Sequence, residues 1–392
     1  MAVYKIFPYK DASLYSMFPT MNTGIDPILQ VSNLNFALNT APTVARSLVA
    51  FDSSEMQDVI NNKVTGSWDA YLKGFIATAQ GIVESSVLEI WPIGEYWWNG
   101  TGTYLDQPLT TDGVSWNSPQ FDGGKQWDGL STGYNSGSGT TYFITASYLP
   151  ASASAGGGNW VVYDSTGTNY QVTQTFDLRS DKDLKVGVTT IVNSWYSASS
   201  GLGGIINNGF LLKWENAAEF SPHKQVQPVL QYYSVDTNTI YPPTLEFRWD
   251  DFVWATSSAI SVLNQPNAFI SLAENPGIFY SGSVNRFRLN CRPKYPARVW
   301  STSSLYTTQY YLPSGSTLYA VKDLDTDEYV IEFDNTYTQV SADTTSSYFD
   351  VYMNGLEPER YYKIQIQVTA GGSTTIYDDN YYFKVKNGWV IL

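Results

Sequence analysis

The chain of 392 residues carries 22 Lys and Arg against 36 Asp and Glu, which gives a formal net charge of −14. This sign disfavours nucleic acids and anionic membranes as partners, because both bind a basic face, and the one cation-rich window, residues 286–298, is short and interrupted by apolar residues. Hydrophobic residues make up 43% and charged residues 15% of the chain, a composition that predicts a folded protein and excludes a disordered one.

Aromatic residues reach 16% of the chain, with 30 Tyr, 18 Phe and 13 Trp. Such residues favour pleated sheets and interfaces, so the composition predicts a β-protein whose surface contacts a partner. The single cysteine, Cys291, excludes an internal disulfide framework and is compatible with assembly in a reducing cytoplasm. The first ten residues lack the apolar stretch of a secretion signal. We therefore expect a soluble protein that is not exported by the general secretion pathway.

Residues 1–93 alternate short β-prone runs with turn residues. A helix is predicted over 53–60, because a serine cap precedes Met56, Val59 and Ile60 at i, i+3, i+4 spacing. The predicted strands are 11–15, 28–31, 45–51, 71–78 and 86–91. This pattern indicates a sandwich of sheets.

The composition changes over residues 94–167, where Gly, Ser, Thr, Asn, Trp and Tyr predominate. We interpret this stretch as a long insertion of extended loops at one edge of the sandwich, and long loops in compact domains are usually functional or interfacial. Residue patterns typical of strands and helices return after residue 167. The predicted elements are strands at 170–176, 184–188, 210–214, 231–235 and 245–249 and a short helix at 189–195.

A second set of strands follows at 278–390, with the short regular spacing of a sandwich. Its clearest period-2 strand is 361–368 (YYKIQIQV). The stretch 256–275, with a proline inside it, is the predicted boundary. We therefore predict two β-domains, residues 1–255 and 256–392.

Four features in order resemble the jelly-roll domain of the DNRLRE type, which is related to a carbohydrate-binding module family. The matching stretches are 11–15 with the turn at 22–24, 46–52, 183–195 followed by 208–212, and 233–246. The resemblance implies a jelly-roll fold for the first domain. The enlarged middle, about 94–167, is a departure from it.

Residues 355–362 (GLEPERYY) resemble the turn-Leu-x-Pro-x-x-Tyr corner of fibronectin type III and immunoglobulin-like sandwiches, in which a tyrosine anchors the sheet-crossing turn. The predicted fold class is therefore all-β: a jelly-roll-like sandwich with a long loop insertion, then an Ig/fibronectin-like sandwich. The run 287–296 (FRLNCRPKYP), with 311–313 and 359–363, resembles virion structural proteins of marine contractile-tailed phages, including those that infect cyanobacteria. That resemblance implies a location in the particle, with other virion subunits as partners in a symmetric assembly. Assembly in the host cytoplasm fits the missing secretion signal.

No combination of residues indicates catalysis, a cofactor or a metal. The one histidine, His223, has no Gly-x-Ser-x-Gly nucleophile elbow with it, and one Cys with one His cannot supply the usual zinc site. We expect Cys291 to be a buried, inert thiol. The acids at 323–328 (DLDTDE) start like a calcium loop but lack its central Gly and distal Glu, so an acidic hairpin turn is favoured over a metal site.

The candidate contact residues are aromatic side chains of the insertion that lie among Gly, Asn and Ser. They are Tyr96, Trp97, Trp98, Trp116 and Trp127. Packing against a neighbouring subunit is the favoured role, because Trp and Tyr are enriched at interface hot spots. Stacking on sugar rings and covering the loop's own core are the alternatives.

Three functions are compatible with these features. The favoured one is a non-enzymatic structural component of a virion, in the tail, baseplate, neck or fibre region, that acts by protein–protein docking. The second is a glycan-binding receptor-recognition protein at a fibre or tail tip. The third is a polysaccharide depolymerase, for which Glu95 and the pair Asp250 and Asp251 are carboxylates near aromatic residues.

Overall fold

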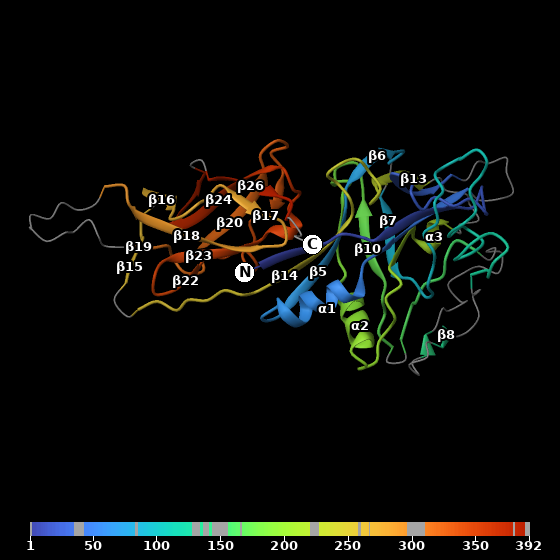
Figure 1. Cartoon of the computed structure of the whole chain (residues 1–392), viewed down its shortest axis with the longest axis horizontal. Coiled ribbons are helices and arrows are strands. Elements are labelled where there is room, and N and C mark those ends of the chain that lie inside the picture. The colour runs from blue at the N-terminus through green and yellow to red at the C-terminus, as the bar shows by residue number, and fades with distance from the viewer. Residues whose placement is uncertain are drawn as a thin grey trace, which may run out of the picture. The chain divides into compact units, whose positions relative to one another are not determined.

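The structure is a computed structural model (Figure 1). It describes residues 2–34, 43–82, 85–127, 134–135, 141–142, 156–164, 167–219, 227–257, 260–265, 267–295, 310–378 and 381–388. Contacts divide the chain into two compact units. The N-terminal unit comprises Ile6–Asn62 and Asp69–Glu246, and the C-terminal unit comprises Met1–Lys5, Lys63–Trp68 and Phe247–Leu392. The predicted domain limits, 1–255 and 256–392, stay a prediction, because compactness does not establish which segments fold independently.

The N-terminal unit contains an eight-stranded sheet of order β10-β7-β12-β4-β3-β13-β6, with β2 paired to β4. Its strands are β2 (Lys10–Tyr15), β3 (Ile28–Asn33), β4 (Val44–Ala50), β6 (Ile76–Gln80), β7 (Ser86–Pro92), β10 (Val172–Phe176), β12 (Phe210–Trp214) and β13 (Gln227–Tyr233). Every residue of β2, β4 and β12 is buried, so both faces of the sheet centre are covered.

Successive side chains along a β-strand point to opposite faces of its sheet, so the residues of each strand here belong alternately to one face and to the other. On one face Val49 and Leu212 line an apolar space together with Leu72 of β5 (Trp68–Gly74) and Leu184 of β11 (Leu184–Gly187). β5 and β11 pair antiparallel with each other. On the other face the alternate residues of β4 pack against the insertion. The aromatic loops thus lie directly on a central sheet.

One predicted strand, 71–78, is two strands in the structure. β5 ends at Gly74 and β6 begins at Ile76. β5 pairs with β11, whereas β6 pairs with β13 of the eight-stranded sheet, so the chain changes sheets at Phe75. β-prone residues lie on both sides of Lys73 and Gly74, which is why the sequence indicates a single strand.

The predicted helices form α1 (Ser53–Asn62) and α2 (Thr189–Ser199), and α3 (Asn216–Glu219) is a short addition. The first helix is capped by Asp52 instead of a serine: Asp52 Oδ1 accepts the backbone N–H of Ser54 at 2.6 Å. In α2, Trp195 is fully buried and its ring centroid lies 4.6 Å from that of Phe210.

The C-terminal unit contains two six-stranded sheets. One has the order β15-β19-β18-β23-β22 with β16 paired to β18, and the other has the order β17-β26-β24-β20-β21 with β25 paired to β24. The first is built from β15 (Ser261–Val262), β16 (Ala268–Leu272), β18 (Val284–Pro293), β19 (Tyr310–Tyr311), β22 (Ser341–Ala342) and β23 (Ser347–Tyr352). The second is built from β17 (Ile278–Tyr280), β20 (Thr317–Asp323), β21 (Tyr329–Ile331), β24 (Tyr361–Ala370), β25 (Ser373–Tyr377) and β26 (Tyr382–Lys386).

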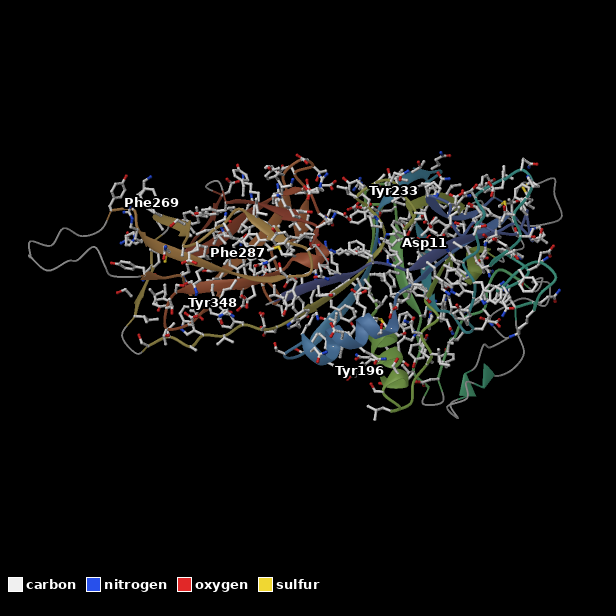
Figure 2. The ribbon with its side chains drawn as sticks, viewed as in Figure 1. Asp11, Tyr196, Tyr233, Phe269, Phe287 and Tyr348 are labelled. Atoms are coloured by element: carbon white, nitrogen blue, oxygen red, sulfur yellow. The ribbon has the colours of Figure 1, made fainter. Side chains whose placement is uncertain are left out.

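Aromatic side chains from both sheets fill the space between them. The ring of Phe287, labelled in Figure 2, stacks on Phe349 at 5.4 Å between centroids and lies 5.6 Å from Phe383 of the other sheet. Tyr319 stacks on Phe349 at 4.3 Å. The prediction of an all-β fold with sandwiched sheets is therefore confirmed. The stretch 256–275, the predicted boundary, contains β15 and β16.

The predicted tyrosine corner is present, but its anchor is one residue later than the motif spacing indicates. The side chain of Tyr362 is 1% exposed and its hydroxyl donates to the backbone oxygen of Glu357 at 2.9 Å. Tyr361 is 50% exposed. Glu359, in the turn before β24, has a positive φ of 64°, and the buried tyrosine is the second residue of that strand.

We expect Tyr362→Phe to lower the free energy of unfolding of the C-terminal unit by about 1–2 kcal/mol, because the Glu357 carbonyl loses its donor in a partly buried position. Tyr361→Phe is the matched control and should change it by less than about 0.5 kcal/mol. Chemical denaturation followed by circular dichroism compares the two. Equal effects of the two substitutions would contradict the assignment of Tyr362 as the anchor.

Candidate functional site

Three of the five predicted contact residues are buried in the N-terminal unit. Trp97 is 0%, Trp127 4% and Trp116 7% exposed. The indole Nε1 of Trp97 donates to the backbone oxygen of Asn208 at 2.9 Å, and that of Trp127 donates to Ser115 at 3.0 Å. These rings cover the core beneath the loops, which is one of the alternatives that the sequence left open, and they are not accessible to a partner.

The insertion is fixed to the sheet through Arg46 of β4. The guanidinium carbon of Arg46 lies 4.9 Å from the ring centroid of Trp116 and 5.3 Å from that of Trp160. Its Nη1 donates to the backbone oxygen of Gly157 at 2.6 Å. Gly157 has a positive φ of 76°, and a Cβ there would lie 2.7 Å from Trp116, so this close approach requires glycine.

Tyr96 and Trp98, the other two predicted residues, are exposed at 58% and 44%. They flank the buried Trp97. The backbone beneath them is paired on both sides, because the Trp98 amide donates to the oxygen of Pro119 and the Trp98 oxygen accepts from the amide of Val114, each at 2.8 Å. The exposed rings therefore stand on a well-supported segment.

Two further exposed rings extend this surface. Phe121 is 41% exposed and its centroid lies 5.7 Å from that of Trp98. Tyr9 is 55% exposed, and it shares the ammonium of Lys10 with Tyr96, at 5.3 Å and 4.2 Å from the two ring centroids. Neither Tyr9 nor Phe121 is among the predicted contact residues. We call Tyr9, Tyr96, Trp98 and Phe121 the aromatic loop surface.

The buried Lys10 contacts two rings of the aromatic loop surface, those of Tyr9 and Tyr96. Its side chain is 4% exposed, and burial lowers the pKa of its amine to about 8. The ammonium donates to the backbone oxygen of Trp97 and lies 4.1 Å from the Trp97 ring centroid. A cation against ring faces in a desolvated position is a stabilising arrangement, so Lys10 orders Tyr9 and Tyr96 before any partner binds.

Glu95, the carboxylate next to these rings, supports the loops. It is 3% exposed, its Oε2 accepts from Lys125 Nζ and its Oε1 from Asn159 Nδ2, both at 2.7 Å. Both carboxylate oxygens are thus engaged with other parts of the insertion. Asp250 and Asp251, the other candidate acids, belong to the C-terminal unit.

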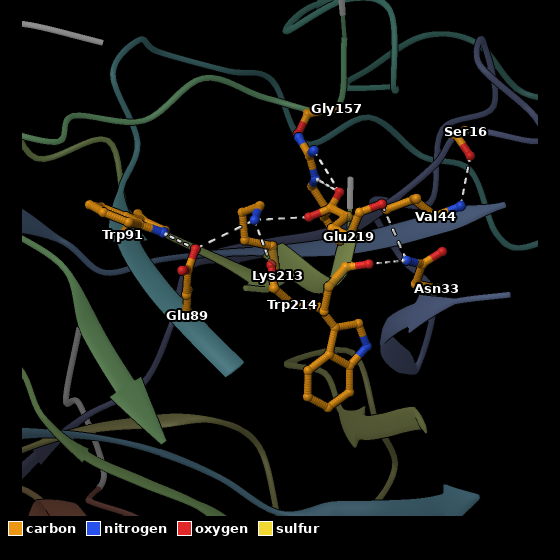
Figure 3. A network of polar contacts seen from close by, with 11 residues as sticks. Ser16, Asn33, Val44, Glu89, Trp91, Gly157, Lys213, Trp214 and Glu219 are labelled. Carbon is orange, nitrogen blue, oxygen red and sulfur yellow. Dashed lines mark hydrogen bonds and ion pairs between the residues drawn. The ribbon is translucent and has the colours of Figure 1, made fainter. Parts of the chain in front are cut away.

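Beneath the insertion lies a buried network of charges, which Figure 3 shows. Glu219 is completely buried and accepts from Arg46 Nε at 2.8 Å and Nη2 at 2.6 Å, and it pairs with Lys213 Nζ at 2.9 Å. Lys213 also reaches Glu89 at 3.4 Å. Burial alone would raise the pKa of Glu219, but Arg46 and Lys213 hold it below the ordinary value. The network joins β4, β7 and β12 to the insertion and α3, and its role is structural.

Another buried acid, Asp11 of β2, lies in the N-terminal unit (Figure 2). It is 1% exposed and its Oδ2 accepts the backbone N–H of Val235 at 2.7 Å. Burial raises the pKa of Asp11 well above its ordinary value, and the nearby carboxylates of Asp236 and Asp26 add to the increase. The folded chain therefore binds this proton more tightly than the unfolded chain.

Asp11→Asn should raise the free energy of unfolding at pH 7 by about 1–3 kcal/mol and change it little near pH 3.5, because Asp11 is mostly protonated in both states there. The cost of burying the ionised Asp11 appears only as the pH rises above 3.8, the ordinary pKa of an aspartate. Urea titrations at both pH values measure the difference from the native chain. Asp112→Asn, an exposed carboxylate, is the control, and an Asp11→Asn chain that is less stable at pH 7 would contradict the account.

The remaining predicted features lie away from the loops. Cys291 is buried, as predicted, and burial raises the pKa of its thiol to about 12. The acidic stretch forms the turn of the β20–β21 hairpin, as predicted. Both oxygens of Asp323 accept from Arg360, at 2.6 Å each. His223 lies outside the described residues.

Within the described ranges, no helix is long and apolar enough to span a membrane, and no group of three or more His, Cys, Asp or Glu side chains is placed to hold a metal ion. The chain matches no family model, and no curated protein matches it.

Proposed function

We propose that the chain is a non-enzymatic structural component of a phage virion that docks on other virion subunits. The observation that carries this proposal is the aromatic loop surface, in which exposed rings stand on a segment anchored by buried tryptophans. Rigid aromatic side chains bind at a low cost in conformational entropy, and such residues dominate interface hot spots. The resemblance of residues 287–296 to phage virion proteins indicates the kind of particle.

Immunogold electron microscopy of purified particles tests this proposal, with an antibody raised against the recombinant chain. Label at the neck, head, tail or baseplate is the expected result. Absence of label, in particles that a control antibody against a known subunit does label, would contradict it.

Binding of glycans at a fibre or tail tip is the second candidate. Trp98 and Phe121 favour it, because their rings form an exposed pair at 5.7 Å, and aromatic faces stack on sugar rings. This function predicts label at fibre ends. It also predicts that Trp98→Ala abolishes binding to a host polysaccharide in a pull-down assay while particle assembly continues.

A polysaccharide depolymerase is less well supported. A carboxylate pair of a glycosidase needs oxygens that can reach the scissile bond. Both oxygens of Glu95 are occupied by Lys125 and Asn159 in a buried position. We therefore propose binding without turnover.

A further inference from the structure

One strand of the C-terminal unit presents a row of cations. Along β18, Phe287, Leu289 and Cys291 are buried, whereas Arg286 and Arg292 alternate with them and are exposed. Residues 284–298 contain five Lys and Arg and no acidic residue. This stretch has a positive net charge, although the chain as a whole has a net charge of −14.

The two cations at one end of this row are neutralised by neighbouring strands or turns. Arg286 pairs with Asp350 and Arg288 with Asp343, each at 2.8 Å. Both guanidinium groups also lie near the ring of Tyr348, with the carbon of Arg286 at 4.0 Å from its centroid. This end of the row is satisfied within the unit.

The other end is not neutralised in the same way. No ion pair involves Arg292 or Lys294 in the part of the chain that the structure describes. The guanidinium carbon of Arg292 lies 4.6 Å from the ring centroid of Phe269, and Lys294 Nζ lies 5.9 Å from that of Tyr295. Phe269 is 44% and Tyr295 77% exposed, and Figure 2 shows Phe269 standing out from the ribbon. We call Phe269, Arg292, Lys294 and Tyr295 the basic strip.

The charge of the chain is divided unequally between the two units. The N-terminal unit has 9 Lys and Arg against 21 Asp and Glu, a net charge of −12. The C-terminal unit has 13 against 15, a net charge of −2. Exposed acids accompany the aromatic loop surface: Asp122 follows Phe121, and Asp112 is bound to Thr101 of the same loops at 2.6 Å. The chain therefore carries an acidic aromatic surface and a basic aromatic strip.

We propose that the basic strip of one copy docks on the aromatic loop surface of a second copy. Arg292 and Lys294 meet Asp112 and Asp122, and the rings on both sides cover the contact and exclude water. The two surfaces differ and lie in different units, so the contact forms either twice in a two-fold dimer or once per neighbour in a head-to-tail ring or filament. This inference rests on the proposed function, because it names the partner of the aromatic loop surface.

Zero-length carbodiimide crosslinking tests the contact, since it joins an amine to a carboxylate only where the two touch. Unlabelled and ¹⁵N-labelled full-length chains are mixed at low salt, and mass spectrometry identifies the crosslinks between differently labelled copies. We expect crosslinks that join Lys294 to Asp112 or Asp122. Their yield should fall at about 0.5 M NaCl, because salt screens the attraction between exposed charges. Inter-copy crosslinks that omit Lys294 would overturn the proposal.

Sedimentation of variants provides an independent readout. Arg292→Glu should weaken self-association at least about tenfold, which corresponds to about 1.4 kcal/mol, whereas Lys386→Glu, a cation on β26, should leave it unchanged. A chain that sediments as a monomer at every salt concentration would overturn the inference. So would a chain that binds dextran sulfate saturably through the basic strip and does not bind a second copy. A chain that self-associates but is absent from particles would instead overturn the proposed function alone.

Discussion

Replacing Glu219 with Gln is expected to lower the free energy of unfolding of the N-terminal unit by about 3–5 kcal/mol. Glu219 is fully buried and is the shared partner of Arg46 and Lys213. Gln keeps the shape but removes the charge, so two buried cations are left with Glu89, at 3.4 Å from Lys213, as their nearest compensation. Breaking a buried ion pair from one side costs far more than the pair contributes, because the remaining charge stays desolvated.

Glu215→Gln is the matched control for this prediction, because Glu215 lies in the same segment and is only half-buried. It should change the stability by less than about 0.5 kcal/mol. Since the pKa of Glu219 is lowered in the folded state, its contribution is present at neutral pH and is lost as the pH falls through the ordinary value of 4.5 toward the folded one. Equal unfolding curves for Glu219→Gln and the native chain would show that the network is not a structural support.

The double substitution Trp98→Ala, Phe121→Ala should reduce incorporation of the chain into particles at least about tenfold and leave its unfolding temperature nearly unchanged. Both rings are exposed, so the folded unit does not depend on them, whereas loss of a paired aromatic hot spot costs binding about 2 kcal/mol or more. The measurement is the ratio of variant to native chain in particles assembled when both are supplied together.

Leu178→Ala with Leu202→Ala is the control for that experiment, because these side chains are 72% and 79% exposed elsewhere in the same unit. The control should enter particles as the native chain does. Equal incorporation of both double variants would contradict docking through the aromatic loop surface. Normal incorporation of Trp98→Ala, Phe121→Ala together with lost adsorption to host cells would favour the glycan-binding function.

The sequence predicts the order and type of most strands, because their alternation and turn residues are local signals. It does not predict where the chain changes sheets at Phe75, since β-prone residues lie on both sides of Lys73 and Gly74 and the pairing partners are distant in the sequence. It also leads to Tyr361 as the corner tyrosine, whereas Tyr362 is the buried anchor. The two tyrosines are adjacent in β24 and face opposite sides of the sheet, so only the tertiary packing identifies which one is buried.

The candidate site is less predictable than the fold, because exposure is decided by contacts between distant segments. Trp97 and Trp98 are adjacent and chemically identical, yet Trp97 is buried because its indole reaches Asn208, 111 residues away. Phe121 and Tyr9 join the surface from positions that no motif marks. The composition of the insertion predicts an aromatic contact region, and only the tertiary contacts identify which rings are available.

Quantitative mass spectrometry of purified particles tests the central claim most directly, with isotope-labelled peptides of this chain and of the major capsid protein as standards. A structural component should be present at a fixed number of copies per particle that does not change between preparations or after washing with 1 M NaCl. A chain that is absent, or whose amount varies and falls with each wash, would contradict its assignment as a virion subunit.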